Sequence, residues 1–359
     1  MIHWALVIAS AILVALTLPG TIELAMLTLA GMLPARERAT TRTGLPLWKL
    51  AIVIPAYDEA ATIARCVRSV ATCTKPDSVE TQIVVVADNC TDATADLARA
   101  AGARVLVRSD STRRGKGFAL EYAFRVLLDE GFDAVFVVDA DSIVDTNLLL
   151  EIVRLFAAGA DGMQVRDVVL NPEAGLRARL MSVAFMAFNV LRPRGRQRMG
   201  LSVGIFGNGF GLSRDTLAAV PFNAHSLVED LEYHLQLVRA GRKIVFADDT
   251  RVRTEMPTAG GGASRQRARW EGGRLRTAFH KLPGLLAGAV SGEPRLIEPS
   301  LELLLLPLAF HVALLALAAL MPFSLVRIYS VLALALVGVH VVAGIVVGGG
   351  DWRDFAALL

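Results

Sequence analysis

Long apolar stretches lie at the two ends of the chain, and a more polar segment lies between them. The windows 1–22, 303–323 and 328–347 contain no Asp, Glu, Lys or Arg. About 20 such residues cross a bilayer, and each apolar residue at the centre of a span favours insertion by roughly 0.3–0.6 kcal/mol. We therefore expect one transmembrane helix at 1–33, two more within 300–350, and a cytosolic or interfacial tail at 351–359.

Two other interpretations of these windows are a secretory signal at the start and buried core helices at the end. A signal peptide is disfavoured, because residues 1–33 have no basic segment at their beginning and no obvious small-residue cleavage site. Basic residues follow the first window closely, at Arg36, Arg38, Arg42 and Lys49. Because such residues are enriched in cytoplasmic loops, residues 34–299 are predicted to be cytosolic, in an integral protein of a bacterial plasma (inner) membrane.

The middle segment alternates short apolar runs with amphipathic helical patterns. The runs typical of buried strands are 50–54, 83–87, 104–107, 134–138, 163–165, part of 204–212, and 243–247. The helical patterns cover 59–71, 91–101, 116–130, 176–191, 227–240 and 265–279. This alternation predicts an α/β domain with a parallel sheet covered on both faces.

Composition narrows the function classes further. The chain has 359 residues, 54% of them hydrophobic, and a mean hydropathy of +0.50, which is too apolar for an ordinary soluble protein. A net charge of only +3 gives no indication of a nucleic-acid partner. Three cysteines, an odd number in a domain expected to be cytosolic, favour free thiols: Cys66, Cys73 and Cys90.

Acidic residues follow several of the predicted strands. Glu59, Asp88 and Asp139 lie just past strand ends, so they are expected to meet in one crevice at that edge of the sheet. Asp139 and Asp141 are two residues apart and can direct carboxylates towards one hard cation such as Mg²⁺. Solvated loop acids are the alternative interpretation of this pair.

Other polar positions allow both a structural and a functional interpretation. In the functional interpretation, Asp88 accepts an N–H from a nucleobase. In the structural interpretation, Asp88 or Thr91 caps the next helix. Asp58 is expected to cap the helix at 59–71. Lys116 stands in a glycine-containing turn before a helix, where an anion binds well, although a solvated basic turn explains it equally. The spacing excludes a Walker A loop.

Two further motifs occur later in the chain. Glu229 and Asp230 begin a helix, where the dipole favours acids, but Asp230 also has the chemistry of a general base. Gln266, Arg269 and Trp270 share a helix face, and Arg269 can pair with a diphosphate while Trp270 offers a flat wall. Adsorption of this basic helix to anionic lipid is the alternative.

Taken together, these strings resemble family 2 glycosyltransferases of the GT-A fold, across residues 50–279. The string Ile54-Pro55-Ala56-Tyr57-Asp58-Glu59 is similar to the opening nucleotide-binding string of that family, in which Asn is more common at the place of Asp58. Gln266, Arg269 and Trp270 match the Gln-X-X-Arg-Trp motif of its membrane-bound branch, which includes cellulose, chitin and hyaluronan synthases and ceramide glucosyltransferases.

The resemblance implies a Rossmann-like GT-A domain with a mixed sheet, flanked by transmembrane helices, and assigns roles to residues. Asp139 and Asp141 would hold a divalent cation (Mg²⁺ or Mn²⁺), and Asp230 would be the catalytic base. The implied donor-binding residues are Pro55, Tyr57, Glu59, Asp88 (on uracil), Lys116, Asp139, Gln266, Arg269 and Trp270. The implied acceptor-side residues are Gly207, Asn208, Gly209, Glu229 and Trp270.

The implied reaction is an inverting transfer of a sugar from a nucleotide-sugar, with UDP as the nucleotide, to a lipid or glycan acceptor beside membrane lipid. A processive β-polysaccharide synthase is an alternative, but three almost purely apolar spans would hardly enclose a channel for a growing chain. A sugar nucleotidyltransferase would not need the motifs at 229–230 and 266–270. An inactive nucleotide-binding membrane protein is disfavoured, because all of the acids are present.

Overall fold

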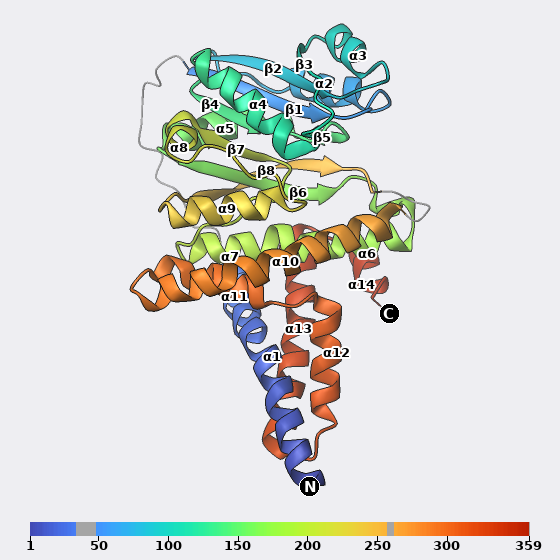
Figure 1. The fold of residues 1–359 in the computed structure, drawn as a ribbon. Coiled ribbons are helices and arrows are strands. Elements are labelled where there is room, and N and C mark those ends of the chain that lie inside the picture. Colours follow the sequence, from blue (N-terminus) through green and yellow to red (C-terminus); the bar gives the residue numbers. More distant parts are fainter. Residues whose placement is uncertain (34–47, 257–261, 359) are drawn as a thin grey trace. The chain divides into compact units, whose positions relative to one another are not determined.

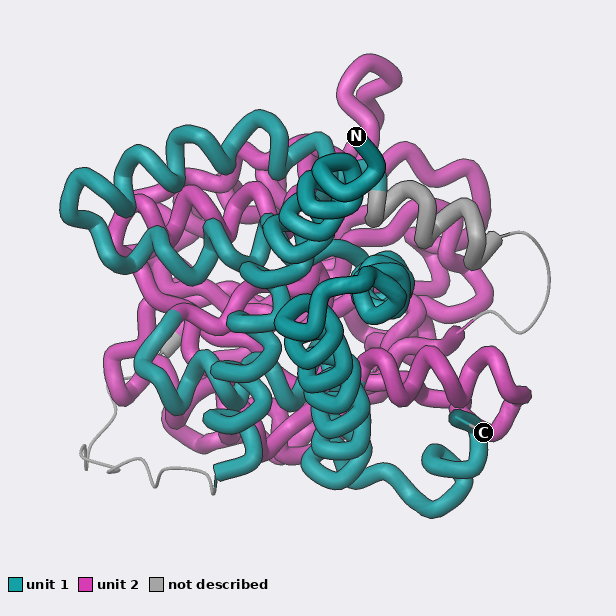
Figure 2. The backbone as a smooth tube through the Cα atoms, turned by 90° about the horizontal axis from the view of Figure 1, so that it is seen from below, with its two compact units in different colours: residues 1–35, 186–201, 261–359 teal, residues 36–185, 202–260 magenta. Residues whose placement is uncertain are grey.

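The computed structural model describes residues 1–33, 48–256 and 262–358, with the side chains of residue 48 and residues 262–271 left out of the description. The chain forms two compact units (Figure 2). Unit 1 combines Met1–Ala35, Met186–Leu201 and Gly261–Leu359, and unit 2 combines Arg36–Phe185 and Ser202–Gly260. Each unit is built from segments that are far apart in the sequence.

Unit 2 contains an eight-stranded sheet in the order β3-β2-β1-β4-β7-β6-β8-β5 (Figure 1). Its strands are β1 (Trp48–Ala56), β2 (Val79–Asp88), β3 (Arg104–Arg108), β4 (Ala134–Val137), β5 (Ser142–Val144), β6 (Gly162–Val169), β7 (Phe210–Ser213) and β8 (Ile244–Thr254). Every predicted strand is present, and the short β5 is an addition.

Strand direction departs from the parallel sheet that the alternation predicts. β1 pairs in parallel with β2 and β4, and β2 with β3. β7 runs antiparallel to β4 and β6, and β5 runs antiparallel to β8. The sheet is therefore mixed, as the resemblance implies. Beyond β4 the alternation does not fix strand direction: β7 runs against both of its neighbours although helical segments within 176–198 precede it, whereas β6 and β8 are parallel.

Both faces of the sheet are covered, as predicted. Alternate residues of β1 point to opposite faces: Ile52 and Ile54 pack on one, and Ala51 and Val53 on the other. The first face is covered by α2 (Ile63–Ala71), α3 (Thr94–Ala100) and α5 (Leu148–Ala157). The second is covered by α4 (Lys116–Asp129), α8 (Arg214–Ala219) and α9 (Glu229–Arg239). A 3₁₀ turn (Pro172–Ala174) and α6 (Leu176–Phe185) follow β6.

Unit 1 is helical among its described residues. It consists of α1 (Ile2–Met32), a π-helical turn (Met186–Leu191), α7 (Arg192–Arg198), α10 (Gly262–Val290), a 3₁₀ turn (Pro294–Leu296), α11 (Ile297–Leu304), α12 (Leu308–Ala319), α13 (Ser324–Gly348) and α14 (Trp352–Ala356). In the described part of the chain, α1 and α13 are each long and apolar enough to cross a membrane.

The span predicted at 303–323 is wrong as a single helix. Residues Pro294–Leu304 and Leu308–Ala319 form a pair bent by 77°. The break falls before Pro307, which has no N–H with which to continue the hydrogen bonding of α11. The 12 residues of α12 extend roughly 18 Å, short of a bilayer core of about 30 Å, so this pair is a third span only if both helices contribute.

Charged side chains are buried where α1, α7 and α11 meet inside unit 1. Glu23 of α1 has no exposed surface and accepts hydrogen bonds from Arg192 and Arg196 of α7. Arg196 also pairs with Glu298 and Glu302 of α11. The helices approach closely here because Gly195 has no side chain to collide with the backbone of Leu27.

We predict that Glu23→Gln strongly destabilises unit 1. The change leaves two buried guanidinium groups with less negative charge around them, and breaking a buried pair costs about 3–5 kcal/mol. Thermal unfolding in detergent should show the loss as a lower Tm. The control is Glu293→Gln, which removes a half-exposed pair with Arg295 and should leave the Tm within about 1 °C. Equal Tm values for the two variants would contradict a stabilising role for Glu23.

Candidate active site

The site lies at the carboxyl ends of the central strands of unit 2. β4 ends at Val137, so Asp139 and Asp141 fall in the loop that leads to β5. Lys116 is the first residue of α4 and follows Gly115, whose φ of +120° is accessible chiefly to glycine. The Lys116 ammonium donates to the Asp139 carboxylate, and to the carbonyl oxygen of Gly207 at 2.8 Å.

Asp230 belongs to the same site. It stands with Glu229 in the first turn of α9, where the helix dipole favours acids, and its Oδ1 accepts from the backbone N–H of Leu231 at 2.8 Å, so the structural interpretation of these two acids stands beside the functional one. A Cβ placed on Gly207 would lie 3.4 Å from Oδ2 of Asp230 and 3.7 Å from Nζ of Lys116. The side chains of Asp230 and Lys116 therefore both approach Gly207, whose φ of +80° favours glycine.

Electrostatics favour the neutral form of Asp230. Burial and the neighbouring Glu229 raise the pKa of Asp230 to about 7, and Lys116 opposes this rise. Burial acts to lower the pKa of Lys116, but Asp139, Glu229 and Asp230 outweigh it, so the net shift is upward. The lysine therefore stays charged while the acid titrates near neutrality, which suits a general base.

The Asp139–Asp141 loop suits a divalent cation. Burial raises the pKa of Asp141 to about 6, with further contributions from Asp139 and Glu59. A bound cation would favour the ionised form of this carboxylate and so oppose the rise. The donor set of carboxylate oxygens matches the preference of Mg²⁺ and Mn²⁺ for oxygen ligands.

A network of buried amides and hydroxyls supports this loop. The Asn208 side-chain carbonyl accepts from the Asp139 backbone N–H at 3.0 Å, and its amide donates to Ser142 and Thr254 at 3.0 and 2.9 Å. Gln164 of β6 donates to the carbonyl oxygens of Asn208 and Gly209. The side chain of Asn208 is thus directed at the Asp139 loop, so any acceptor contact from this tripeptide is expected from its backbone or its glycines.

Sequence reasoning missed four residues of this network: Ser142, Gln164, Asp167 and Thr254. The available signal was the placement of Gln164 and Asp167 among apolar residues of β6, since a fully buried polar side chain in a strand needs partners. Cys66 was also missed. Its buried thiol lies under the loop and donates to the carbonyl oxygen of Asp139 at 3.4 Å. Cys66, Cys73 and Cys90 are free thiols, as predicted.

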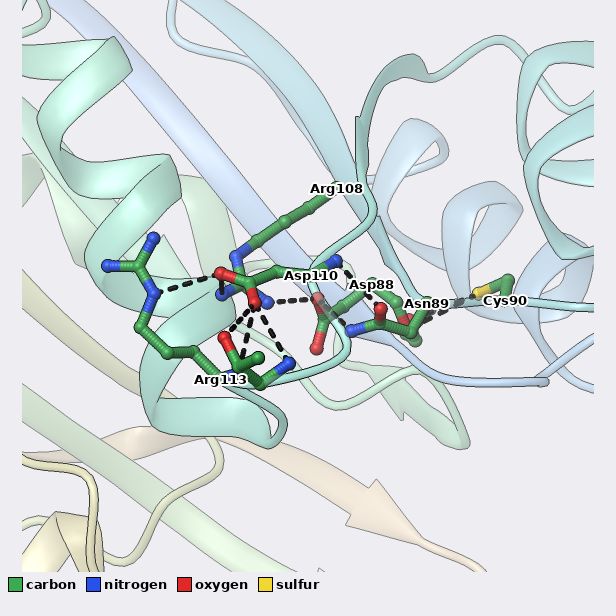
Figure 3. A network of polar contacts seen from close by, with 8 residues as sticks. Asp88, Asn89, Cys90, Arg108, Asp110 and Arg113 are labelled. Atoms are coloured by element: carbon green, nitrogen blue, oxygen red, sulfur yellow. Dashed lines mark hydrogen bonds and ion pairs between the residues drawn. The ribbon is translucent and has the colours of Figure 1, made fainter.

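Asp88 is an ion-pair partner and not a helix cap. Its carboxylate accepts from Arg108 at 2.6 Å (Figure 3), whereas α3 begins at Thr94 after Ala93 and has no side-chain cap. The predicted cap at Asp58 is also wrong, because α2 begins only at Ile63. Asp58 instead accepts from the backbone N–H of Thr91 at 2.6 Å, and so joins the loops that follow β1 and β2.

The remaining predicted donor residues occupy the end of β1 and the turn after it. Pro55 is the penultimate residue of β1, and Tyr57 follows it with an exposed side chain. The Glu59 carboxylate accepts from Thr62 at 2.8 Å and acts electrostatically on Asp141. Gln266, Arg269 and Trp270 lie on α10, but their side chains are outside the described residues, so their roles stay predictions.

Among the described residues, one group of three metal-ligating side chains consists of Asp58, Cys90 and Asp92. Hydrogen bonds already engage these carboxylates, since Asp58 accepts from Thr91 and Asp92 accepts from Thr94 and Ala60. A solvated turn therefore accounts for this group without an ion.

The mixed sheet, its covering helices and the acids at its strand ends define a GT-A-like fold. The family model described as "Glycosyltransferase like family 2" matches residues 46–273, and the chain belongs to this family. No curated protein gives a significant sequence match.

The chain is also similar to solved structures of other glycosyl-transferring proteins. A mannosyltransferase from Pyrobaculum calidifontis, in complex with GDP-Man and Mn²⁺, is 17% identical and aligns with a TM-score of 0.55 over 96% of this chain and 99% of that one. Glucosyl-3-phosphoglycerate synthase from Mycobacterium tuberculosis, in complex with Mn²⁺, UDP and phosphoglyceric acid, is 21% identical, with a TM-score of 0.44 over 69% of this chain and 86% of that one. At these identities the likeness concerns the fold.

We predict that Asp167→Asn stabilises the protein increasingly as the pH rises. Burial, together with Asp139, raises the pKa of Asp167 to about 8. Between about pH 4 and pH 8 the folded state therefore keeps a proton that the unfolded state has lost, so the wild type loses stability as the pH increases. The Asn side chain does not titrate.

The measurement is the Tm difference between variant and wild type in detergent at pH 5 and at pH 9. It should grow by at least about 3 °C over this range. Asp96→Asn, at an exposed helix position, is the control and should show no such trend. A difference independent of pH would contradict a protonated Asp167.

Proposed function

We propose that the protein is an inverting glycosyltransferase that moves a sugar from a nucleotide-sugar, with UDP as the nucleotide, to a lipid acceptor at the cytosolic face of a bacterial plasma membrane. Family membership supports sugar transfer, and the two long apolar helices support membrane attachment. The observation that carries the proposal is the grouping of Asp230, Lys116 and Asp139 around Gly207.

The chemistry follows from these groups. An acceptor hydroxyl attacks the anomeric carbon, its proton passes to the Asp230 carboxylate, and the bond from that carbon to the diphosphate oxygen breaks. Asp139 and Asp141 would hold a Mg²⁺ or Mn²⁺ ion, which neutralises charge on the departing diphosphate when bound. Lys116 supplies positive charge beside Asp139, and attack from the face opposite the leaving group inverts the configuration.

Other residues are proposed to position the donor and the acceptor. Asp88 accepts the ring N–H of uracil, and Pro55, Tyr57 and Glu59 line the nucleoside end. On α10, Gln266 and Arg269 are proposed to bind the donor diphosphate, and Trp270 is proposed to form a wall for the sugar or the acceptor. Glu229 and the 207–209 loop complete the acceptor side.

A lipid acceptor fits the membrane part better than a growing polysaccharide does. The candidate spans are α1, α13 and, as a bent pair, α11 with α12. Three spans would hardly enclose a channel for a growing glycan, and polar side chains that they carry bond to one another, as Thr17 does to Tyr329 and Thr28 to His340. The proposed order along the chain is a span at 1–33, a cytosolic transferase domain at 34–299, two C-terminal spans within 300–350 and an interfacial tail.

The first experiment incubates the purified full chain with radiolabelled UDP-sugars and GDP-sugars, Mn²⁺ and bacterial lipid extract. We expect a labelled, organic-soluble product that carries one or a few β-linked sugars, formed from a UDP-sugar. Chelation with EDTA should abolish its formation, and added Mn²⁺ or Mg²⁺ should restore it. A long water-soluble polymer would overturn the lipid acceptor, and transfer unaffected by EDTA would overturn the cation.

Asp230→Asn is expected to lower kcat by about a hundredfold or more, because the amide does not accept the acceptor proton. UDP affinity should stay unchanged in calorimetry, since Asp230 is not proposed to contact the nucleotide. Because the pKa of Asp230 is raised to about 7, wild-type kcat should increase with pH through this value and then level off. The control is Glu232→Gln in the same helical turn, and an active Asp230→Asn variant would exclude Asp230 as the base.

A further inference from the structure

A closed ring of polar contacts surrounds the end of β2 (Figure 3). Asp88 and Arg108 are the last residues of β2 and β3 and are neighbours in the parallel register. Arg108 donates to Oδ1 of Asp88 at 2.6 Å, and both side chains are less than 10% exposed. Asn89, with a φ of +54°, also donates to Oδ1 of Asp88, at 3.0 Å.

Asp110 closes the ring. Its carboxylate pairs with the second terminal nitrogen of Arg108 at 3.2 Å, and its backbone N–H donates to the side-chain oxygen of Asn89 at 2.9 Å. The guanidinium of Arg108 also lies 5.9 Å from the centre of the Phe118 ring, which stacks on His225 at 4.1 Å. Arg108 is therefore held on several sides and has little freedom to turn away from Asp88.

The ring leaves one oxygen of Asp88 for a ligand. Both hydrogen bonds that Asp88 accepts within the described part of the chain end on Oδ1, so Oδ2 is the oxygen available to accept from a bound molecule. A carboxylate oxygen accepts hydrogen bonds, so Oδ2 would pair with a group that offers an N–H and repel one that offers a lone pair.

We propose that Arg108 and Asp110 are positioning residues for nucleobase selection: they hold the Asp88 carboxylate turned so that the site takes a base whose ring N–H adjoins a carbonyl. Uracil and guanine have such an N–H, whereas cytosine and adenine present a bare ring nitrogen at that place. This inference rests on the proposed function, because it concerns the nucleotide of the same donor.

The ring also extends towards the phosphate end of the donor. Oδ1 of Asp110 accepts from the backbone N–H groups of Thr112 and Arg113, both at 3.0 Å. These residues form the turn that leads to Lys116, the first residue of α4. One carboxylate thus fixes both the guanidinium beside Asp88 and the turn before Lys116, so the ring sets the spacing between base and diphosphate contacts.

The test is calorimetric titration of the full chain in detergent, with Mn²⁺ present, using UDP and CDP. The wild type should bind UDP more tightly than CDP. Arg108→Met should weaken UDP binding about tenfold or more, as expected for a lost charged hydrogen bond. It should also reduce the ratio of UDP affinity to CDP affinity, because the Asp88 carboxylate, no longer held by Arg108, can turn away from the ring N–H of uracil.

Two variants and one control separate positioning from general damage. Arg108→Lys should keep part of the preference for UDP over CDP that Arg108→Met loses. Asp110→Asn should reduce this preference less than Arg108→Met does. Arg104→Met lies on the same strand and breaks a pair with Glu130 outside the ring, so it should leave both affinities unchanged. If the wild type prefers GDP, the same comparison uses GDP and ADP.

The outcomes distinguish the two proposals. A wild type that binds no nucleoside diphosphate overturns the proposed function, and the inference with it. If the wild type binds UDP and Arg108→Met leaves the UDP affinity unchanged, only the positioning role is overturned. The same holds if Arg108→Met leaves the ratio of UDP affinity to CDP affinity unchanged.

Discussion

Repulsion among carboxylates at one edge of the sheet is the constraint on which the site depends. Asp139, Asp141, Glu229 and Asp230 gather around a single ammonium group, that of Lys116. Burial, together with the neighbouring acids, raises the pKa of Asp230 to about 7 and that of Asp141 to about 6. In the proposed reaction Asp230 is the base, and Asp141 holds a cation with Asp139. The backbone around them must therefore be rigid, because charges of one sign move apart wherever the chain permits it.

Rigidity comes from side chains that never touch a substrate in the proposed reaction. Gln164 and Asn208 tie the 207–209 loop to the Asp139 loop, and Thr254 of β8 completes the contact. These residues reach the site from three different strands or loops, which explains why a mixed sheet matters. The antiparallel β7 delivers Gly207 and Asn208 from the strand's beginning to the same edge at which the parallel strands end.

The sequence predicted the elements of the sheet because its strands are buried on both faces and read as apolar runs. It also predicted the strand-end acids, since parallel strands deliver their following loops to one edge. The sequence could not predict strand direction after β4, because a strand shows the same hydrophobic periodicity in a parallel and in an antiparallel pair. The supporting contacts of Gln164 and Thr254 were missed because their partners are 42 to 112 residues away in the sequence. Pro307 interrupts α11 and α12 through a missing N–H, a property that hydropathy ignores.

The division of the chain has a consequence for how the protein is made. Met186–Leu201 belongs to the helical unit, yet it is encoded in the middle of the sheet unit. No single continuous fragment of the chain therefore contains one complete unit without part of the other. A fragment limited to the sheet unit would still include Arg192 and Arg196, without the acidic partners that α1 and α11 provide. In the proposed membrane arrangement, α1 would enter the bilayer before the sheet is synthesised, so membrane insertion and folding of the transferase would be interleaved steps of one process.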